Sequence, residues 1–419
     1  MKKIIVITLI IMMVAALAAC GGKDMGSSNG NGTEVITQSS SGDRQGQNEM
    51  PKGADLKAVD FAIRLLKASN DPGKNTLLSP LSVMTALTMT ANGAGGDTLK
   101  EMEKVLGMPI DELNAYLMAY MNSLPSGDKY KLNPANSIWF TSDERFAVDE
   151  EFLKENAAKY GADIFKAPFD DGTLKDINNW VNEKTEGMIP EILDQIPSDA
   201  VMYLINALAF EAEWDETYYD FQVIEDKFTT EDGTEEKVAL MHSQEGTYLE
   251  SDDATGLVKY YNGGKYAFAA LLPKEGTTVE ELITGLDGKK LHDIFADRES
   301  VEVTAAIPKF ETGFDIELSE VLKNMGMPKA FDGNSADFEA LGTSDAGNIF
   351  INRVIHKTFI SVAEQGTKAG AATLVEMTDG CALVEEEPKE VILNRPFVYM
   401  LVDCETWTPF FIGTLMHVE

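Results

Sequence analysis

Histidine and cysteine are scarce in this sequence, which holds four histidines and three cysteines among its 419 residues. No two histidines form an H-E-x-x-H pattern, and no two cysteines have the spacing of a zinc site. The Walker phosphate-loop motif is also absent, and the one G-x-S-x-G match, at residues 26–30, lies in a Gly- and Ser-rich stretch and not at a strand-to-helix turn. These absences argue against a metalloenzyme, an α/β-hydrolase and an enzyme with a phosphate cradle. We therefore expect no metal, no cofactor and no catalytic residue.

One stretch does match a catalytic motif, because Ser126-Gly127-Asp128-Lys129 has the S-x-x-K pattern of penicillin-recognising enzymes. The K-T-G and S-D-N motifs that accompany this pattern in those enzymes are absent. We therefore interpret the four residues as a turn. An acyl-transfer enzyme built on Ser126 and Lys129 is an alternative that would require turnover of a penicillin-like reporter, lost in Ser126→Ala.

Basic residues are about half as frequent as acidic ones. The chain has 35 lysines and arginines against 69 aspartates and glutamates, which gives a net charge of −34. The surface is therefore negative almost everywhere, and nucleic acid and polyanionic polysaccharide are poor partners. Hydrophobic residues make up 44% of the chain and charged residues 25%, as in ordinary soluble globular proteins.

The N-terminus carries an unbroken apolar run over residues 4–16, preceded by two lysines. The run is too short for a comfortable membrane span, and it is closed by Leu17-Ala18-Ala19-Cys20. These four residues resemble a bacterial lipobox, in which the cysteine becomes the mature N-terminus and carries the lipid. The resemblance implies a signal peptide at 1–20, lipid attachment at Cys20, and a location on the extracellular face of the cell membrane.

Residues 21–51 are dominated by Gly, Ser, Asn, Gln and Thr, so they predict a flexible tether. From residue 52 to 419 no repeat occurs, and no linker-like stretch appears before about residue 373. We therefore predict a single domain over 52–419, although it is longer than most domains. With Cys20 assigned to lipid, Cys381 and Cys404 remain, and we expect both to be unpaired thiols.

Hydrophobic periodicity predicts helices first and sheets later. Apolar residues at helical spacing predict an amphipathic helix that ends near Ser69, and Ser79-Pro80 predicts the start of a buried helix that runs to Asn92. Continuous apolar runs and alternation with a period of two predict the strands. These strands lie at residues 201–210, 301–307, 391–393, 397–402 and 410–416. The chain therefore has the pattern of a mixed α+β domain.

Residues 364–373 are neither a good strand nor a good loop. Five of these ten residues are Gly or Ala, so the segment accepts many backbone conformations and could be a loop in one state and a strand in another. With a period of two, four small side chains would share one face and could slide between existing strands without a steric barrier. They are Thr367, Ala369, Ala371 and Thr373.

This segment resembles the proximal hinge of the inhibitory serpins, whose pattern is E-x-G-T-E followed by small residues and threonine. Other stretches are similar to serpin signatures, stand in the serpin order, and cover nearly the whole chain from Asp55 to Glu419. They are Asn75-Thr76-Leu77-Leu78-Ser79-Pro80-Leu81-Ser82, Asn206-Ala207 with Phe210 and Trp214, Ile307-Pro308-Lys309-Phe310, Val354-Ile355-His356-Lys357, Asn394-Arg395-Pro396-Phe397 and Phe411-Ile412-Gly413.

The resemblance implies an α+β serpin fold of three β-sheets and eight or nine helices, with an exposed reactive-centre loop at about 364–393. It also implies a single-use serine protease inhibitor and not an enzyme. A target protease attacks the loop and forms a covalent acyl-enzyme, and the cleaved hinge then inserts as a new strand of the main sheet. We expect a monomer. A cysteine protease is an alternative target, and a non-inhibitory serpin that acts as a carrier is the alternative function.

The resemblance assigns roles to three groups of residues. The hinge would comprise Glu364, Gly366, Thr367, Ala369, Gly370, Ala371, Ala372 and Thr373. A polar cluster beneath the sheet, where its strands separate, would comprise Ser79, Ser82, Asn206 and His356. The loop-entry contacts would comprise Lys309, Trp214 and Glu364, with an ion pair between the lysine and the glutamate.

Two hinge residues depart from the family pattern, because Lys368 replaces the usual acidic residue and Gly370 replaces a usual alanine. By the alternation argument both side chains point outward after insertion, so neither should block it. Gly370 adds flexibility and costs roughly 0.5 to 1 kcal/mol against alanine in a strand.

Family spacing implies that the reactive bond joins Gly380 and Cys381. Met377, Cys381 and Leu383 remain alternatives for the residue at the cleaved bond. A small residue before the bond would suit elastase-like or subtilisin-like proteases. Trypsin-like enzymes are disfavoured because neither Lys nor Arg occurs between residues 373 and 388.

Overall fold

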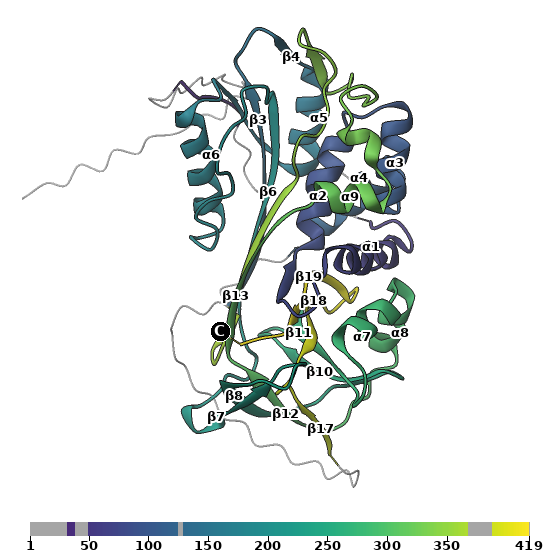
Figure 1. Cartoon of the computed structure of the whole chain (residues 1–419), viewed down its shortest axis with the longest axis vertical. Coiled ribbons are helices and arrows are strands. Elements are labelled where there is room, and N and C mark those ends of the chain that lie inside the picture. Colours follow the sequence, from purple (N-terminus) through teal and green to yellow (C-terminus); the bar gives the residue numbers. More distant parts are fainter. Residues whose placement is uncertain (1–31, 38–48, 125–128, 368–387, 419) are drawn as a thin grey trace, which may run out of the picture.

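The computed structural model describes residues 32–37, 49–124, 129–367 and 388–418 (Figure 1). Its largest element is a seven-stranded sheet, the main sheet, with the strand order β1-β5-β3-β6-β16-β15-β13. The bounds of these strands in the same order are Glu34–Thr37, Asp163–Ala167, Tyr130–Thr141, Met202–Glu213, Gly366–Thr367, Ile355–Ala363 and Phe310–Glu317.

Two further sheets complete the β structure. A six-stranded sheet has the order β2-β19-β18-β11-β10-β9. Its strands are Thr76–Leu78, Thr408–Leu415, Phe397–Asp403, Tyr266–Pro273, Ala254–Tyr260 and Tyr248–Glu250. A four-stranded sheet of order β17-β12-β8-β7 lies at one end of the molecule (Figure 1). Its strands are Lys389–Ile392, Val303–Pro308, Glu235–Glu245 and Val223–Thr229.

The expected α+β fold with three sheets is confirmed, and the described residues add a two-stranded ribbon of β4 (Phe146–Val148) and β14 (Gly342–Ser344). The same residues form nine α-helices, within the expected eight or nine. Helices α1 to α9 are Ala54–Ser69, Pro80–Ala91, Gly96–Leu106, Ile110–Ser123, Glu150–Tyr160, Asp171–Lys184, Val279–Gly285, Gly288–Ala296 and Ser319–Met325. The 3₁₀ helices η1 and η2 are Asp220–Gln222 and Pro328–Phe331.

Helix α2 lies beneath the main sheet because its side chains are apolar or small almost all round. Ser79 caps it, since the Ser79 Oγ accepts a hydrogen bond from the backbone N–H of Ser82 at 3.3 Å. Pro80 opens the helix at a position where a backbone N–H is not needed. The helix contacts β6 on one side and β19 on the other, so it links the main sheet to the six-stranded sheet.

Helix α6 covers the opposite face of the main sheet (Figure 1). A second hydrophobic core forms there, in which the rings of Trp139 and Phe165 stack with their centroids 4.0 Å apart against Ile177 and Trp180 of α6. Around β3, β5 and β6 the main sheet is therefore covered by helices on both faces, whereas alternate residues of β13 are exposed.

Strand β1 lies within the segment that the sequence assigns to a flexible tether, and that prediction is wrong for residues 34–37. Val35 lies opposite Phe165 of β5, which makes β1 the edge strand of the main sheet. Thr33 is buried, and its Oγ1 donates a hydrogen bond to Oδ2 of Asp176 at 2.8 Å. The polar composition of residues 21–51 does not predict this strand, because a segment can pair with an open sheet edge through its backbone with few apolar side chains.

In the described part of the chain, no helix has both the length and the apolar character needed to cross a membrane. The predicted signal peptide and Cys20 lie outside that part.

Candidate functional site

The main sheet contains a strand of only two residues. Strand β16 consists of Gly366 and Thr367 and lies between β6 and β15, antiparallel to both. Gly366 is opposite Glu213 of β6 and Ala363 of β15. Among the residues that the structure describes, β6 and β15 do not pair directly with each other, so β16 alone joins them. The main sheet therefore carries the beginning of one further strand.

Position 366 requires glycine. Its φ angle is +153°, and a Cβ added there would lie 2.0 Å from the carbonyl oxygen of Ala212 in β6. That distance is far inside van der Waals contact with a backbone atom that cannot move aside. The predicted hinge therefore meets β6 at a residue whose missing side chain permits the close approach.

Two aromatic residues hold the chain just before β16. The backbone N–H of Trp214 donates to the carbonyl oxygen of Gln365 at 2.9 Å, and its indole Nε1–H donates to that of Ala363 at 2.8 Å. The backbone N–H of Tyr218 donates to the carbonyl oxygen of Glu364 at 2.9 Å. The carbonyl groups of residues 363–365, where the predicted hinge begins, are thus all hydrogen-bonded to the segment that follows β6.

A third aromatic residue holds β16 itself. The hydroxyl of Tyr261 is hydrogen-bonded to the Oγ1 of Thr367, whose side chain is only 2% exposed. The Tyr261 ring stacks on Trp214 with a centroid separation of 4.4 Å and an interplanar angle of 7°. We call Trp214, Tyr218 and Tyr261 the hinge clasp.

The loop-entry residues suggested by the sequence lie together. The Nζ of Lys309 is 2.9 Å from Oε1 of Glu364, which lies at the turn between β15 and β16. Trp214 donates hydrogen bonds to the carbonyl oxygens on either side of Glu364. The lysine side chain is 47% exposed and the glutamate 29%, so water screens the pair and it contributes about 0.5 kcal/mol.

We expect Glu364→Lys to accelerate the loss of active monomer by roughly threefold to tenfold. The substitution removes the ion pair and places two ammonium groups at the turn, which raises the free energy of the native hinge by about 1 kcal/mol. Native gel electrophoresis and residual inhibition during warm incubation would measure this loss. The charge swap Lys309→Glu with Glu364→Lys is the control and should restore the monomer. Unchanged inhibition and monomer content in the single variant would contradict the assignment.

Three of the four residues of the predicted polar cluster are hydrogen-bonded to one another. His356 Nε2 accepts from the backbone N–H of Ser79 at 3.0 Å, and the Ser79 hydroxyl donates to the Ser82 Oγ at 2.9 Å. Asn206 bonds elsewhere, because its Nδ2 donates to Oδ1 of Asn136 at 2.8 Å. The buried Oδ1 of Asn206 has no hydrogen-bond partner among the described residues.

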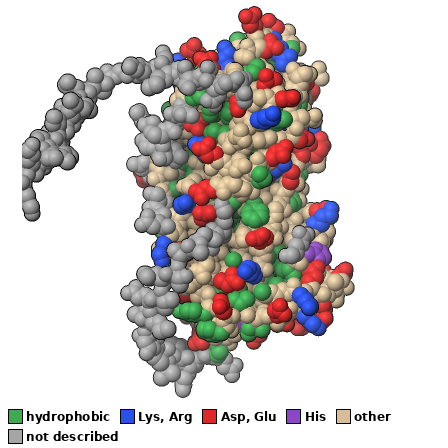
Figure 2. Space-filling model, turned by 90° about the vertical axis from the view of Figure 1, so that its left-hand side faces the viewer, with side chains coloured by type: hydrophobic (Ala, Val, Ile, Leu, Met, Phe, Trp, Pro, Cys, Tyr) green, Lys and Arg blue, Asp and Glu red, His purple; other side chains and the backbone are tan. Residues whose placement is uncertain are grey.

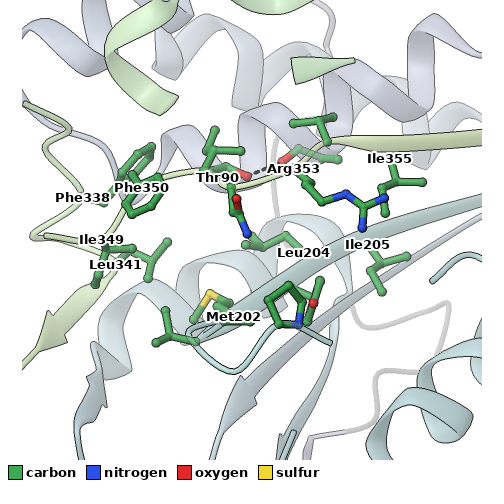
Figure 3. Close-up of a pocket in the computed structure, with 18 of the residues that line it drawn as sticks. Thr90, Met202, Leu204, Ile205, Phe338, Leu341, Ile349, Phe350, Arg353 and Ile355 are labelled. Carbon is green, nitrogen blue, oxygen red and sulfur yellow. Dashed lines mark hydrogen bonds between the residues drawn. The ribbon is translucent and has the colours of Figure 1, made fainter. Parts of the chain in front are cut away.

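A cavity of about 370 Å³ separates the first part of β6 from the segment that leads into β15 (Figure 3). Residues 199–206 form one wall, residues 346–356 form the other, and α2 contributes to the floor. Figure 3 shows that the walls are largely apolar, with Leu204 and Ile205 on one side and Ile349 on the other. The strands that β16 joins at one end are therefore separated by open space at the other. Ser82, Asn206 and His356 also line this space.

Burial gives His356 a pH-dependent effect on stability. Burial lowers the pKa of His356 to about 4, whereas the unfolded chain has a value near 6.5. Between these values the unfolded chain binds a proton that the folded protein does not. The contribution of His356 to the free energy of unfolding is therefore fully present above about pH 6.5. It is lost as the pH falls to about 4, and the total loss is about 3 kcal/mol.

His356→Gln should remove this part of the pH dependence, because glutamine keeps a hydrogen-bond acceptor but does not titrate. Denaturant midpoints measured for both proteins from pH 7.5 to 4 would show a smaller loss for the variant. Parallel curves for the two proteins would mean that the His356 ring is hydrated and titrates normally.

Lys259 belongs to this site, although its only signal in the sequence is a charge within an apolar strand. It is 2% exposed, and its Nζ lies 2.8 Å from Oε1 of Glu245 and 4.5 Å from the ring centroid of Tyr218. Glu245 Oε1 also accepts from the Ser243 hydroxyl at 2.6 Å. The ammonium group therefore supports one residue of the hinge clasp by a cation–π contact.

Several sequence-predicted residues lie outside the described ranges. They are Cys20, Ser126, Lys368, Ala369, Gly370, Ala371, Ala372, Thr373, Met377, Gly380, Cys381 and Leu383. Lys129, the other end of the S-x-x-K stretch, forms an ion pair with Glu213 at 3.3 Å. Cys404 is an unpaired thiol, as expected, and burial raises its pKa to about 12. In the described residues no group of three or more His, Cys, Asp or Glu side chains is placed to bind a metal.

The class of protein follows from this arrangement. A main sheet with a two-residue strand between β6 and β15, backed by α2 within a three-sheet frame, is the serpin architecture. Residues 57–418 match the family model described as serpin (serine protease inhibitor). The chain belongs to the serpin family.

Similar proteins agree with this membership. An uncharacterized serpin-like protein of Thermococcus kodakarensis is 32% identical over 85% of this chain and 84% of its own length. The native state of tengpin, a thermophilic serpin, is 46% identical over 90% of this chain and 97% of its own, with a TM-score of 0.84. The latent state of tengpin gives 45% identity over 88% and 99%, with a TM-score of 0.79. Thyroxine-binding globulin with bound thyroxine shares the fold, with a TM-score of 0.76. It is 24% identical over 88% of this chain and 100% of its own.

Proposed function

We propose that this protein is a single-use inhibitor of serine proteases. A target protease cleaves within residues 368–387, and the freed hinge then enters the main sheet between β6 and β15. The observation that carries the proposal is β16. Its two residues already pair with both strands, antiparallel to each, which is the direction that a longer inserted strand would follow.

The protease supplies the catalysis. Its serine Oγ attacks the carbonyl carbon of the reactive bond, the peptide C–N bond breaks, and the leaving amine takes a proton from the protease histidine. An ester then joins protease and inhibitor, and insertion of the hinge before this ester is hydrolysed traps the complex. A bond at Gly380–Cys381 suits an elastase-like or subtilisin-like target, and a cysteine protease would form a thioester instead.

Two features of the structure support insertion at this place. Within the described residues β6 and β15 pair only through β16, so a longer strand would break no direct pairing between them. The cavity of about 370 Å³ lies between the same two elements at their other end. The TM-score is also higher against native tengpin, 0.84, than against latent tengpin, 0.79, so the described residues resemble the native state more than the latent state.

We also propose that the mature protein is attached to the extracellular face of the membrane by lipid on Cys20. Because β1 belongs to the main sheet, residues 21–32 limit the distance between the lipid and the folded domain. An extended chain of this length spans about 40 Å. The inhibitor would therefore act close to the membrane surface. Metabolic labelling with a fatty acid, lost in Cys20→Ser, would test the attachment.

Incubation of residues 32–419 with a panel of purified proteases tests the inhibitory function. We expect an SDS-resistant complex with at least one elastase-like or subtilisin-like protease, release of a C-terminal fragment whose mass gives the cleaved bond, and a higher melting temperature after cleavage. Cleavage without a complex and without a gain in melting temperature would overturn the proposal and favour a non-inhibitory carrier.

A further inference from the structure

Three large apolar side chains within one six-residue stretch are exposed at the end of the molecule that holds the four-stranded sheet. Tyr219 and Phe221 belong to the segment around η1, and Ile224 lies on the edge strand β7. Their exposed fractions are 45%, 79% and 51%. We call these three residues the aromatic patch. Figure 2 shows hydrophobic side chains gathered at the lower end of this face, where Figure 1 places the four-stranded sheet.

The structure presents the aromatic patch on a fixed turn. The rings of Tyr219 and Phe221 stack with centroids 5.5 Å apart and an interplanar angle of 8°. The backbone N–H of Tyr219 donates to Oε1 of Gln222 at 2.9 Å, and Nε2 of Gln222 donates to the carbonyl oxygen of His242 at 3.0 Å. Tyr218 anchors the turn from within the core. Large apolar side chains held outward in this way are a recognised mark of an interaction surface.

Exposed acidic residues flank the aromatic patch along the chain. The exposed acids in the same stretch are Asp215, Glu216, Asp220, Glu225 and Asp226. Lys227 is also exposed, but it is paired with Glu235 at 2.6 Å. The partner that fits this surface has an apolar contact region with a basic rim. A second copy of the chain would bring two acidic rims together, and an anionic lipid surface would repel them.

The position of the patch relative to the loop indicates which partner that is. Tyr218, adjacent to the patch, donates to the carbonyl oxygen of Glu364 at the start of the hinge. The chain returns from residues 368–387 into β17, which belongs to the same four-stranded sheet as β7. Both attachment points of the predicted reactive loop therefore lie at the end of the molecule that carries the aromatic patch. A protease that attacks this loop must approach that end.

We propose that Tyr219, Phe221 and Ile224 form a second docking surface for the target protease, outside its active-site cleft. This proposal rests on the proposed inhibitory function. The acidic rim attracts a protease with a basic surface, and the aromatic patch is covered when the protease settles on the loop. The surface acts on the encounter that precedes cleavage. It therefore sets the rate at which a protease binds the inhibitor and selects which proteases bind. The trapping step that follows does not depend on it.

The variant Tyr219→Ser with Phe221→Ser tests the proposal, and Leu56→Ser, an exposed apolar residue on α1, is the matched control. The second-order rate constant of inhibition would be measured with the panel protease that the wild-type protein traps fastest. We expect about a tenfold lower rate constant for the double variant, with the stoichiometry of inhibition and the melting temperature unchanged. The control should keep the wild-type rate constant.

Charge gives a second readout. Raising the salt concentration should lower the rate constant of inhibition by the wild-type protein. The double variant Glu225→Gln with Asp226→Asn should show a weaker dependence of this rate constant on salt. Equal rate constants for the aromatic variant and the wild-type protein would overturn the docking surface while leaving the inhibitory function intact. Absence of any covalent complex with the wild-type protein would instead refute the inhibitory function. A wild-type dimer, or binding to lipid vesicles, that the aromatic variant loses would assign the patch to a second copy or to a membrane and overturn this proposal.

Discussion

Replacing Thr367 by arginine should leave a protein that proteases still cleave but no longer trap. Thr367 is buried in β16 against the hydroxyl of Tyr261, beside the stacked ring of Trp214. An arginine there must either be buried without a carboxylate partner or keep the hinge out of the sheet. An unpaired buried charge costs about 3 kcal/mol, which corresponds to roughly 150-fold in the rate of insertion. The ester would then be hydrolysed before insertion is complete.

The measurement is the stoichiometry of inhibition, defined as the number of inhibitor molecules consumed for each protease molecule trapped. We expect a rise from near one to well above ten for Thr367→Arg, together with release of the cleaved fragment. Gln365→Arg is the matched control, because residue 365 meets Trp214 through its backbone carbonyl. That control should trap protease normally. Trapping by Thr367→Arg at the wild-type stoichiometry would show that residue 367 does not stay in the sheet.

Glu245→Leu should destabilise the protein by about 3 to 5 kcal/mol, because it leaves the Lys259 ammonium buried without its carboxylate. Lys259 is enclosed by Tyr218 and Trp214, with 4.5 Å and 5.6 Å from its Nζ to the two ring centroids. These aromatic contacts compensate only part of the lost charge pairing. The midpoint of denaturant-induced unfolding, followed by tryptophan fluorescence, measures the change.

The double variant Lys259→Met with Glu245→Leu provides the control. Replacing both members of a buried ion pair by apolar side chains of similar volume is often neutral or stabilising. The double variant should therefore recover most of the stability that Glu245→Leu loses. If Glu245→Leu unfolds at the wild-type midpoint, water reaches the ammonium and the pair is not needed. If the double variant recovers its stability but its hinge moves faster than that of the wild-type protein, the charge of Lys259 also holds the hinge clasp in place.

Two residues of the hinge clasp lie in the same short segment after β6 as Tyr219 and Phe221 of the aromatic patch. Trp214 and Tyr218 turn inward and bind the hinge carbonyls, whereas Tyr219 and Phe221 turn outward. A protease docked on the outer side would therefore contact the same segment that restrains the hinge on the inner side. Substitutions in this segment need both readouts, the rate constant of inhibition and its stoichiometry, to separate the two roles.

Local sequence signals predicted the parts of the fold that depend on neighbouring residues. Ser79-Pro80 marked the start of α2 because the cap and the fixed φ of proline act within one helical turn. Alternation predicted β12, and continuous apolar runs predicted β18 and β19. The small side chains of residues 364–373 suggested a segment able to join a sheet, and its first strand-forming residues, Gly366 and Thr367, do lie in one.

Contacts between residues far apart in the chain escaped prediction. The edge strand β1 exists because β5 offers an unpaired edge, and nothing in residues 34–37 names that partner. Asn206 and His356 were grouped by resemblance, yet Asn206 bonds to Asn136, its register partner on the adjacent strand β3. The cavity between residues 199–206 and 346–356 likewise has no sequence signature, since both of its walls are ordinary apolar segments.

The sequence by itself determined the family pattern, the strongly acidic surface and the place where the chain can change from loop to strand. These properties follow from residue types and from spacing within a few residues. Only the tertiary structure decided that Gly366 and Thr367 lie in the main sheet, that Lys259 is buried beneath the hinge clasp, and that Phe221 is exposed next to the edge strand of the four-stranded sheet. Burial and exposure are set by which distant segments pack together, and a lysine or a phenylalanine in the sequence does not reveal its neighbours.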